Sequence, residues 1–89
     1  MTEAEVQIVN RLGLHARAAA RFVHLANGFG SRITVSKDGS RVDGKSILGL
    51  LTLAAARGAK LRLAAEGEDE EEAIRTLTRL VRDRFGEAE

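Results

Sequence analysis

The sequence switches repeatedly between two apolar spacings, and this switching limits the folds that the chain can adopt. Apolar residues fall at every second position over residues 3–8, 32–37 and 60–65, and residues 40–43 add a short further strand. Apolar residues recur at helical spacing over residues 16–27 and 47–55, and again in a last helix that Gly67 and Asp69 open. Arg79, Arg82 and Arg84 lie toward the end of that helix. The predicted order is β-α-β-β-α-β-α.

Asp38 and Gly39 join two of these strands as a hairpin. An Asp-Gly pair supplies the positive φ angles that a two-residue type I′ turn requires. Each strand places apolar residues on one side and polar or small residues on the other, so one face of the sheet should remain open to water. We therefore predict a single α+β domain spanning residues 1–89. It is an open-faced β-sandwich, with a four-stranded antiparallel sheet and three helices on one face.

Composition excludes several classes of protein. The chain has no cysteine, which rules out disulfides and thiolate metal sites, and it has no apolar run of about 18 residues to span a membrane. We expect a cytoplasmic protein with no membrane insertion and no cofactor. Residues 1–65 carry ten Lys and Arg against four Asp and Glu, a basic balance that suits an acidic partner. With three aromatic residues, all Phe, the chain offers few stacking platforms for nucleic acid.

His15 lies at the junction between the first strand and the first helix. The start of a helix exposes unpaired N–H groups and a partial positive charge, which together favour an anion. A neutral imidazole nitrogen is nucleophilic near neutral pH. Once it carries phosphate, the N–H groups of Ala16 and Arg17 and the guanidinium of Arg17 can hold the anion. These features predict an exposed relay that exchanges phosphate with other proteins, not a self-contained enzyme.

A simpler interpretation of His15 stays open, in which it is a surface residue or a helix cap. No Asp or Glu lies near it in the sequence to orient the ring. Residues 86–89 are expected to form a frayed tail. His15 and His24 are nine residues apart with no carboxylate near either, so we expect no metal site.

The helix predicted over residues 47–55 is apolar on nearly every side. Ser46 is a good N-cap for it, and Gly58 is expected to end it. If Leu50, Leu53 and Ala54 face the sheet, the outer side carries Ile47, Leu48 and Leu51. Either this short helix is buried all round, or these three side chains form an exposed contact patch for partner proteins.

At this point two motifs resemble a known family, the HPr proteins of the bacterial phosphoenolpyruvate-dependent sugar phosphotransferase system. Residues 13–17, Gly-Leu-His-Ala-Arg, are similar to the family's active-site motif. Residues 45–49, Lys-Ser-Ile-Leu-Gly, are similar to its second signature, and residues 57–60 and 65–67 match the turns around the last strand. The resemblance covers essentially the whole chain, and the family's open-faced sandwich agrees with the fold predicted above.

The resemblance implies a function and a set of residues. His15 would accept phosphate on Nδ1 from phosphorylated enzyme I and pass it to the EIIA domain of a sugar permease, and Arg17 matches the family's catalytic arginine. The backbone of Ala16, Arg17 and Ala18 would bind the phosphate, and Ser46 matches a serine that HPr kinase/phosphorylase modifies in many lineages. We expect a monomer whose partner contacts are Leu12, Arg21, His24, Ile47, Leu48 and Leu51.

The sequence also departs from the family pattern at several positions. Ala18 replaces the usual proline, and we hypothesise that its N–H adds a donor near the phosphate. Leu12 stands where a hydroxyl residue is common, and Leu48 and Leu51 replace methionines.

Two alternatives to the phosphocarrier remain. One is a mainly regulatory HPr-like protein controlled through Ser46, although His15 argues against the relative that has lost its histidine. The other is a small RNA-binding module, which the lack of Tyr and Trp disfavours.

Overall fold

The computed structural model describes all 89 residues and contains the predicted elements in the predicted order. The strands are β1 (Thr2–Gln7), β2 (Arg32–Lys37), β3 (Ser40–Asp43) and β4 (Lys60–Glu66). The helices are α1 (Ala16–Ala26), α2 (Ile47–Thr52) and α3 (Glu70–Arg82), and a 3-10 turn, η1 (Arg84–Gly86), follows α3. None of the helices has the length and apolar character needed to cross a bilayer.

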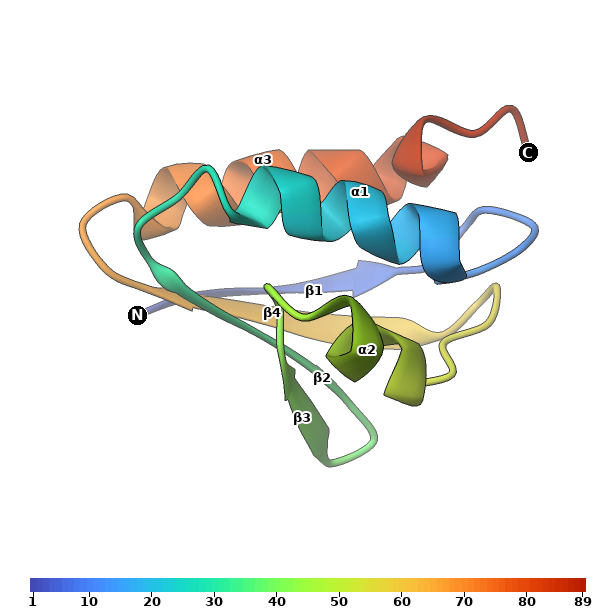
Figure 1. Ribbon diagram of the computed structural model, residues 1–89, viewed down its shortest axis with the longest axis horizontal. Helices are drawn as coiled ribbons and strands as arrows, with labels where there is room; N and C mark the ends of the chain where they lie inside the picture. The colour runs from blue at the N-terminus through green and yellow to red at the C-terminus, as the bar shows by residue number, and fades with distance from the viewer.

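The four strands form one antiparallel sheet in the order β1-β4-β2-β3 (Figure 1). β4 lies between β1 and β2, and its Leu63 is opposite Ala4 of β1 and Val35 of β2. This register aligns the apolar positions of neighbouring strands on one face, because side chains alternate between the two faces of a sheet. Asp38 and Gly39 have φ angles of 51° and 87°, which confirms the predicted hairpin turn.

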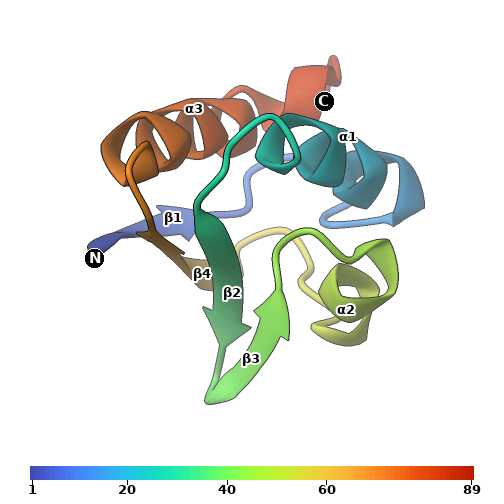
Figure 2. The same cartoon turned by 60° about the vertical axis from the view of Figure 1, so that its left-hand side comes forward.

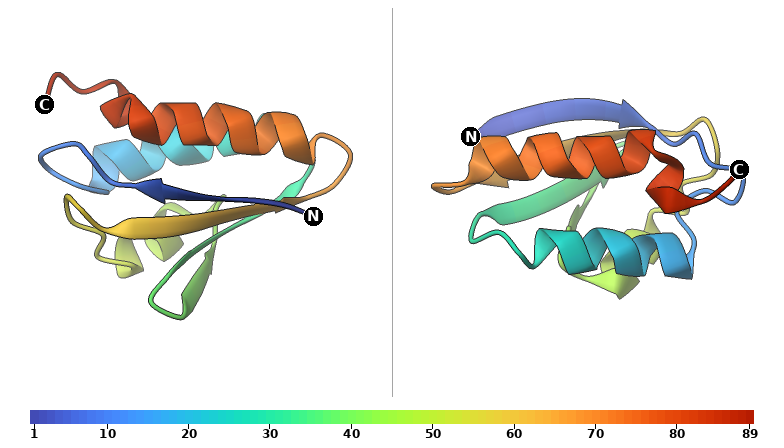
Figure 3. Two further views of the ribbon diagram at one scale, coloured as in Figure 1. Left: turned by 180° about the vertical axis from the view of Figure 1, so that it is seen from behind. Right: turned by 90° about the horizontal axis from the view of Figure 1, so that it is seen from above.

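The helices cover the apolar face of this sheet, so the predicted α+β open-faced sandwich is confirmed. α1 and α3 lie side by side across the sheet, and α2 packs beside α1 and β3 (Figures 2 and 3). The largest fully buried apolar side chains of this core are Phe22, Phe85, Ile8, Ile33, Leu50, Leu61, Leu63 and Leu77. The opposite face carries exposed polar residues such as Glu3, Glu5 and Arg62.

α1 and α3 run in opposite directions, and this arrangement places the last residues of the chain beside the start of α1 (Figures 1 and 3). The C-terminal end of α3 lies near the start of α1 (Figures 1 and 3). The last residues of the chain therefore reach the loop that precedes α1, which is the loop that contains His15.

The second helix, α2, is shorter than predicted: it ends at Thr52 and does not continue to Ala55. The N–H groups of Leu53 and Ala54 bond back to carbonyls three residues earlier, and Ala54 takes a left-handed φ of 49°. Beyond this turn the Ala55 carbonyl accepts a hydrogen bond from Leu14. Gly58, which was expected to end the helix, instead forms the turn that leads into β4, with its N–H bonded to Ile8.

Asp69 precedes α3 as predicted but does not cap it with its side chain. Its carboxylate accepts hydrogen bonds from the Ser31 hydroxyl and from the N–H groups of Gly30 and Ser31. The bond from the Ser31 side chain and that from the Gly30 N–H hold the pKa of Asp69 below its usual value. Asp69 thus ties the start of α3 to the segment before β2.

Candidate functional site

The loop of residues 10–15 is pressed against the end of the α2 segment, and Gly13 makes this close approach possible. Gly13 has a φ of 70°, and a Cβ at this position would lie 2.6 Å from the Ala55 carbonyl oxygen. The next residue, Leu14, is buried and donates its N–H to the same carbonyl at 2.9 Å. The backbone directly before His15 is therefore fixed by packing and by a hydrogen bond.

His15 is the N-cap residue of α1, with φ −82° and ψ 179°. Its side chain makes no capping bond, so the ring is free for other contacts, and 24% of the side chain is exposed. The N–H groups of Ala16, Arg17 and Ala18 in the first turn donate to no protein acceptor. Ala16 and Arg17 are exposed, whereas Ala18 is buried. The N-terminal end of α1 therefore presents the His15 ring and the free N–H groups of the exposed residues Ala16 and Arg17.

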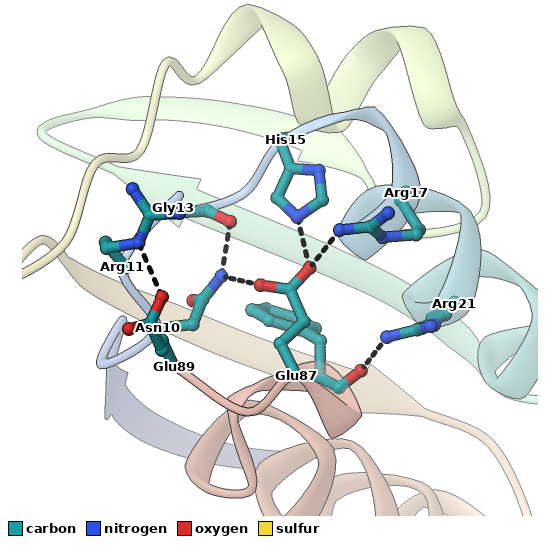
Figure 4. Close-up of polar contacts among 9 residues, drawn as sticks. Asn10, Arg11, Gly13, His15, Arg17, Arg21, Glu87 and Glu89 are labelled. Carbon is teal, nitrogen blue, oxygen red and sulfur yellow. Dashed lines mark hydrogen bonds and ion pairs between the residues drawn. The ribbon is translucent and has the colours of Figure 1, made fainter.

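A carboxylate that is distant in sequence completes the site. Oε2 of Glu87 contacts Nε2 of His15, and the same oxygen lies 3.6 Å from Nη2 of Arg17 (Figure 4). Oε1 of Glu87 accepts a hydrogen bond of 2.9 Å from the amide nitrogen of Asn10. That Asn10 nitrogen also donates to the Gly13 carbonyl at 2.8 Å. Both carboxylate oxygens of Glu87 thus have partners in the loop or at the helix start.

These contacts favour the ionised form of Glu87. The hydrogen bond from Asn10, followed by that from His15 and by the charges of His15 and Arg17, holds the pKa of Glu87 below its ordinary value, against the opposing effect of burial. Only 10% of the side chain is exposed. Glu87 is therefore a carboxylate, held beside the ring of His15, over the neutral pH range.

Residues 84–89 form a C-terminal strap across this site, and the expectation of a frayed tail at residues 86–89 is wrong. Arg84, Phe85 and Gly86 all have positive φ angles, which turn the chain back toward α1. Phe85 is fully buried, and its carbonyl accepts a hydrogen bond of 2.6 Å from Arg21. At the far end Nε of Arg11 pairs with the Glu89 carboxylate at 3.0 Å.

Sequence reasoning missed Glu87 because 72 residues separate it from His15. The available signal was Phe85, which stands four residues after Val81 and continues the apolar spacing of α3 close to the end of the chain. An apolar anchor at that position indicates that the residues beside it are held against the protein. It does not indicate which polar group they meet.

The predicted site residues fall into two groups in the structure. His15 and Arg17 are brought together, although the Arg17 side chain is 61% exposed and turns toward Glu87. Arg21 lies on the next turn of α1 and is tied to the strap, while His24 is exposed farther along the same helix. Leu12 is exposed in the loop before His15.

The second predicted site lies on α2. Ser46 is its N-cap as predicted, and its hydroxyl oxygen accepts a hydrogen bond of 3.0 Å from the Gly49 N–H. Leu48 is 77% exposed and Ile47 40% exposed, whereas Leu51 packs partly on the core. The interpretation of a helix buried all round is therefore wrong. Leu12, Ile47 and Leu48 are large exposed apolar residues, and we call these three the apolar patch.

The chain is similar to known proteins over essentially its whole length. The family model for the HPr component phosphorylation site of the phosphotransferase system matches residues 2–83. The phosphocarrier protein HPr of Neisseria meningitidis serogroup A is 49% identical, with the whole of both chains covered. The chain belongs to the HPr family. The resemblance read from the two sequence motifs is thus confirmed.

Other HPr-family relatives extend this result to solved structures and to a second type of protein. The crystal structure of HPr-C-His from Thermoanaerobacter tengcongensis superposes with a TM-score of 0.96 at 47% identity and covers both chains completely. The HPr-like protein Crh of Bacillus subtilis is 43% identical over 93% of this chain and 98% of its own. Relatives of this chain therefore include both phosphocarrier proteins named HPr and an HPr-like protein named Crh. The choice between these two types of protein depends on the residues of the site.

Proposed function

We propose that this HPr-family protein is a phosphocarrier that accepts a phosphoryl group on His15 from phosphorylated enzyme I. It then passes this group to an EIIA domain of a sugar permease. The observation that carries the proposal is the position of His15, a partly exposed N-cap residue whose side chain does not cap the helix. Such a ring is accessible to a second protein and stands directly at the positive end of a helix.

The chemistry is a transfer between two carriers. The lone pair of Nδ1 of His15 forms the new nitrogen–phosphorus bond, and the bond from phosphorus to the donor breaks with its electron pair staying on the donor. The phosphate then lies at the start of α1, where the free N–H groups of Ala16 and Arg17 and the helix dipole stabilise its charge. Arg17, whose side chain is mostly exposed, can turn to the phosphate and bind two of its oxygens.

Docking of the partner proteins would use the apolar patch, of which Leu12 lies three residues before His15. Isolated exposed apolar residues are common, but two large ones on a six-residue helix, with Leu12 on the loop before His15, suit a protein contact. The basic residues Arg17 and Arg21 would add attraction for an acidic partner surface. Enzyme I and the EIIA domain would bind the same surface one after the other, because each must reach His15.

The proposal is tested by incubating the protein with enzyme I and labelled phosphoenolpyruvate. We expect label that is lost in acid, since phosphohistidine is acid-labile, and we expect none in the His15→Ala variant. The His24→Ala variant is the control for the position of the label: it removes the other histidine and keeps His15, so it should still take up acid-labile label. Label retained by His15→Ala would contradict the proposal.

A second candidate function is regulation through Ser46. The observation in its favour is that Ser46 is only partly buried and stands beside the exposed Ile47 and Leu48. A phosphate there would place two negative charges at the edge of the apolar patch and change which partners bind. Incubation with an HPr kinase/phosphorylase and labelled nucleotide would produce acid-stable label that the Ser46→Ala variant lacks.

The remaining parts of the proposal concern assembly and location. We propose a cytoplasmic monomer that uses no cofactor and binds no nucleic acid. Two related solved structures, an HPr dimer from Thermoanaerobacter tengcongensis and a domain-swapped Crh dimer from Bacillus subtilis, show that relatives can pair. Light scattering during size-exclusion chromatography at several concentrations distinguishes a 9.6 kDa monomer from a dimer.

A further inference from the structure

We propose that Glu87 is a positioning residue for His15, which holds the ring so that Nδ1 is the nucleophilic nitrogen. This inference rests on the proposed function and adds to it a residue from the C-terminal strap. A neutral imidazole carries one proton, on either Nδ1 or Nε2. The Glu87 carboxylate can only accept a hydrogen bond from Nε2, so the proton stays on Nε2 and the lone pair stays on Nδ1.

The contact between His15 and Glu87 is stabilised because both carboxylate oxygens of Glu87 have partners. Nε2 of His15 meets Oε2, while the amide of Asn10, which is fully buried, donates to Oε1 at 2.9 Å. Asn10 is itself oriented by its second hydrogen bond, to the Gly13 carbonyl. Because both oxygens are engaged and the side chain is 90% covered, Glu87 cannot turn away without breaking a hydrogen bond to a buried amide.

The backbone that carries Glu87 is fastened as well. Phe85 anchors the strap in the core, and the Arg21 side chain binds its carbonyl at 2.6 Å. On the other side of Glu87, the side chains of Arg11 and Glu89 form an ion pair, and the Arg11 N–H also donates to the main-chain oxygen of Glu89. Figure 4 shows the ion pair of Arg11 and Glu89 beside the contacts that Glu87 makes. A carboxylate held in this way fixes the orientation of the ring that it touches.

The same carboxylate affects the transfer step. When Nδ1 forms its bond to phosphorus, the ring keeps its proton on Nε2 and gains a positive charge that both nitrogens share. Glu87 lies against Nε2 and stabilises this charge as it develops. Arg17 is 3.6 Å from Glu87 and mostly exposed, so it can leave for the phosphate while Glu87 remains on the ring.

The first test measures the tautomer of His15 without any phosphate donor. Nitrogen-15 NMR of the ring, at a pH where it is neutral, reports the fraction with the proton on Nε2. We expect almost only this form in the wild type and a mixture of both tautomers in the Glu87→Ala variant. The Glu72→Gln variant is the control, because Glu72 is an exposed residue in the first turn of α3 and forms no ion pair or side-chain hydrogen bond. Equal tautomer fractions in the wild type and in Glu87→Ala would overturn the inference.

The second test measures the rate of phosphorylation by enzyme I. We expect Glu87→Ala and the nearly isosteric Glu87→Gln to react roughly tenfold more slowly than the wild type and the control Glu72→Gln, since both Glu87 variants lack the charge beside the ring. A wild-type rate in both Glu87 variants would overturn the role in transfer. Failure of the wild type to be phosphorylated would instead contradict the proposed function and leave the tautomer result to decide the role of Glu87.

Discussion

Gly13 shows how one residue sets the geometry of the site. Its φ of 70° is a left-handed conformation, and the space where a Cβ would stand is taken by the Ala55 carbonyl, 2.6 Å away. A side chain there has to push the loop off the end of the α2 segment. The adjacent hydrogen bond from Leu14 to the same carbonyl would then lengthen or break.

We therefore expect Gly13→Ala to lower both stability and phosphorylation. A strained φ of this kind costs about 1–3 kcal/mol, and the contact with Ala55 adds to that cost. Urea unfolding measures the loss of stability, and the rate of labelling by enzyme I measures the displacement of His15. Gly39→Ala is the matched control, because Gly39 also has a positive φ but a Cβ there would meet no atom within 4 Å. A Gly13→Ala protein no less stable than Gly39→Ala would contradict the packing argument.

The Ser46 side chain likewise has a structural role that can be separated from a regulatory one. Its hydroxyl caps α2 through the Gly49 N–H. We expect Ser46→Ala to lose about 1 kcal/mol of stability, whereas Ser46→Asp, which supplies another good N-cap, should stay within about 0.5 kcal/mol of the wild type. Chemical unfolding of the three proteins tests this, and an equal loss in both variants would refute the capping role.

At the scale of the elements, α2 combines one buried and one exposed apolar face within six residues. Leu50 is 1% exposed and belongs to the core, whereas Leu48, two positions earlier, is 77% exposed. The inner face of α2 thus fixes the helix to the core, and its outer face is exposed. Ser46 is the N-cap of the same helix and directly precedes the exposed Ile47 and Leu48, so in the proposed function a change at Ser46 would alter the docking surface.

This division predicts opposite outcomes for two neighbouring leucines. Leu48→Asp should change stability by no more than about 0.5 kcal/mol, yet raise the KM of enzyme I for this protein, because the proposed docking surface includes this exposed side chain. Leu50→Ala should destabilise by about 2–5 kcal/mol through the cavity it leaves. Thermal unfolding and phosphorylation kinetics separate the two effects. An unchanged KM for Leu48→Asp would contradict the proposed docking surface.

The element order was predictable because apolar periodicity is a local property of the sequence. The alternation of Leu61, Leu63 and Ala65 and the helical spacing of Phe22, Val23 and Ala26 gave both the type and the inward face of their elements. The early end of α2 was not predictable in this way, because residues 53–55 remain apolar after the helix stops. There the tertiary hydrogen bond from Leu14 to Ala55 overrides the local preference.

The site was predictable only in part, for a related reason. His15 and Arg17 belong to one short motif, and the position of His15 directly before a helix follows from the sequence alone. Glu87 reaches His15 only because α1 and α3 are antiparallel and because three left-handed residues reverse the chain after α3. No local pattern encodes that meeting, and charged residues near a chain end are usually solvated.

For the whole molecule, three carboxylates tie segments that are distant in the sequence, and each has a lowered pKa. Asp69 binds the segment around Ser31, and Glu87 binds the loop before α1. Glu70 holds the start of the chain: a hydrogen bond from Thr2, one from the Gly67 N–H and a contact with the N-terminal amine lower its pKa from 4.5 to about 2. The unfolded chain lacks these contacts, so it binds protons more readily than the folded protein does.

We therefore expect the free energy of unfolding to fall as the solution is acidified. A group whose pKa is depressed in the folded state stabilises it fully above the unfolded pKa and loses this effect as pH falls through the folded pKa. For Glu70 that window runs from 4.5 down to about 2. Urea unfolding across this range should give a steep slope for the wild type and a shallower one for Glu70→Gln. Glu72→Gln is the control, since Glu72 lies in the same turn of α3 and forms no ion pair or side-chain hydrogen bond. Parallel slopes for the wild type and Glu70→Gln would show that Glu70 does not hold the chain terminus in solution.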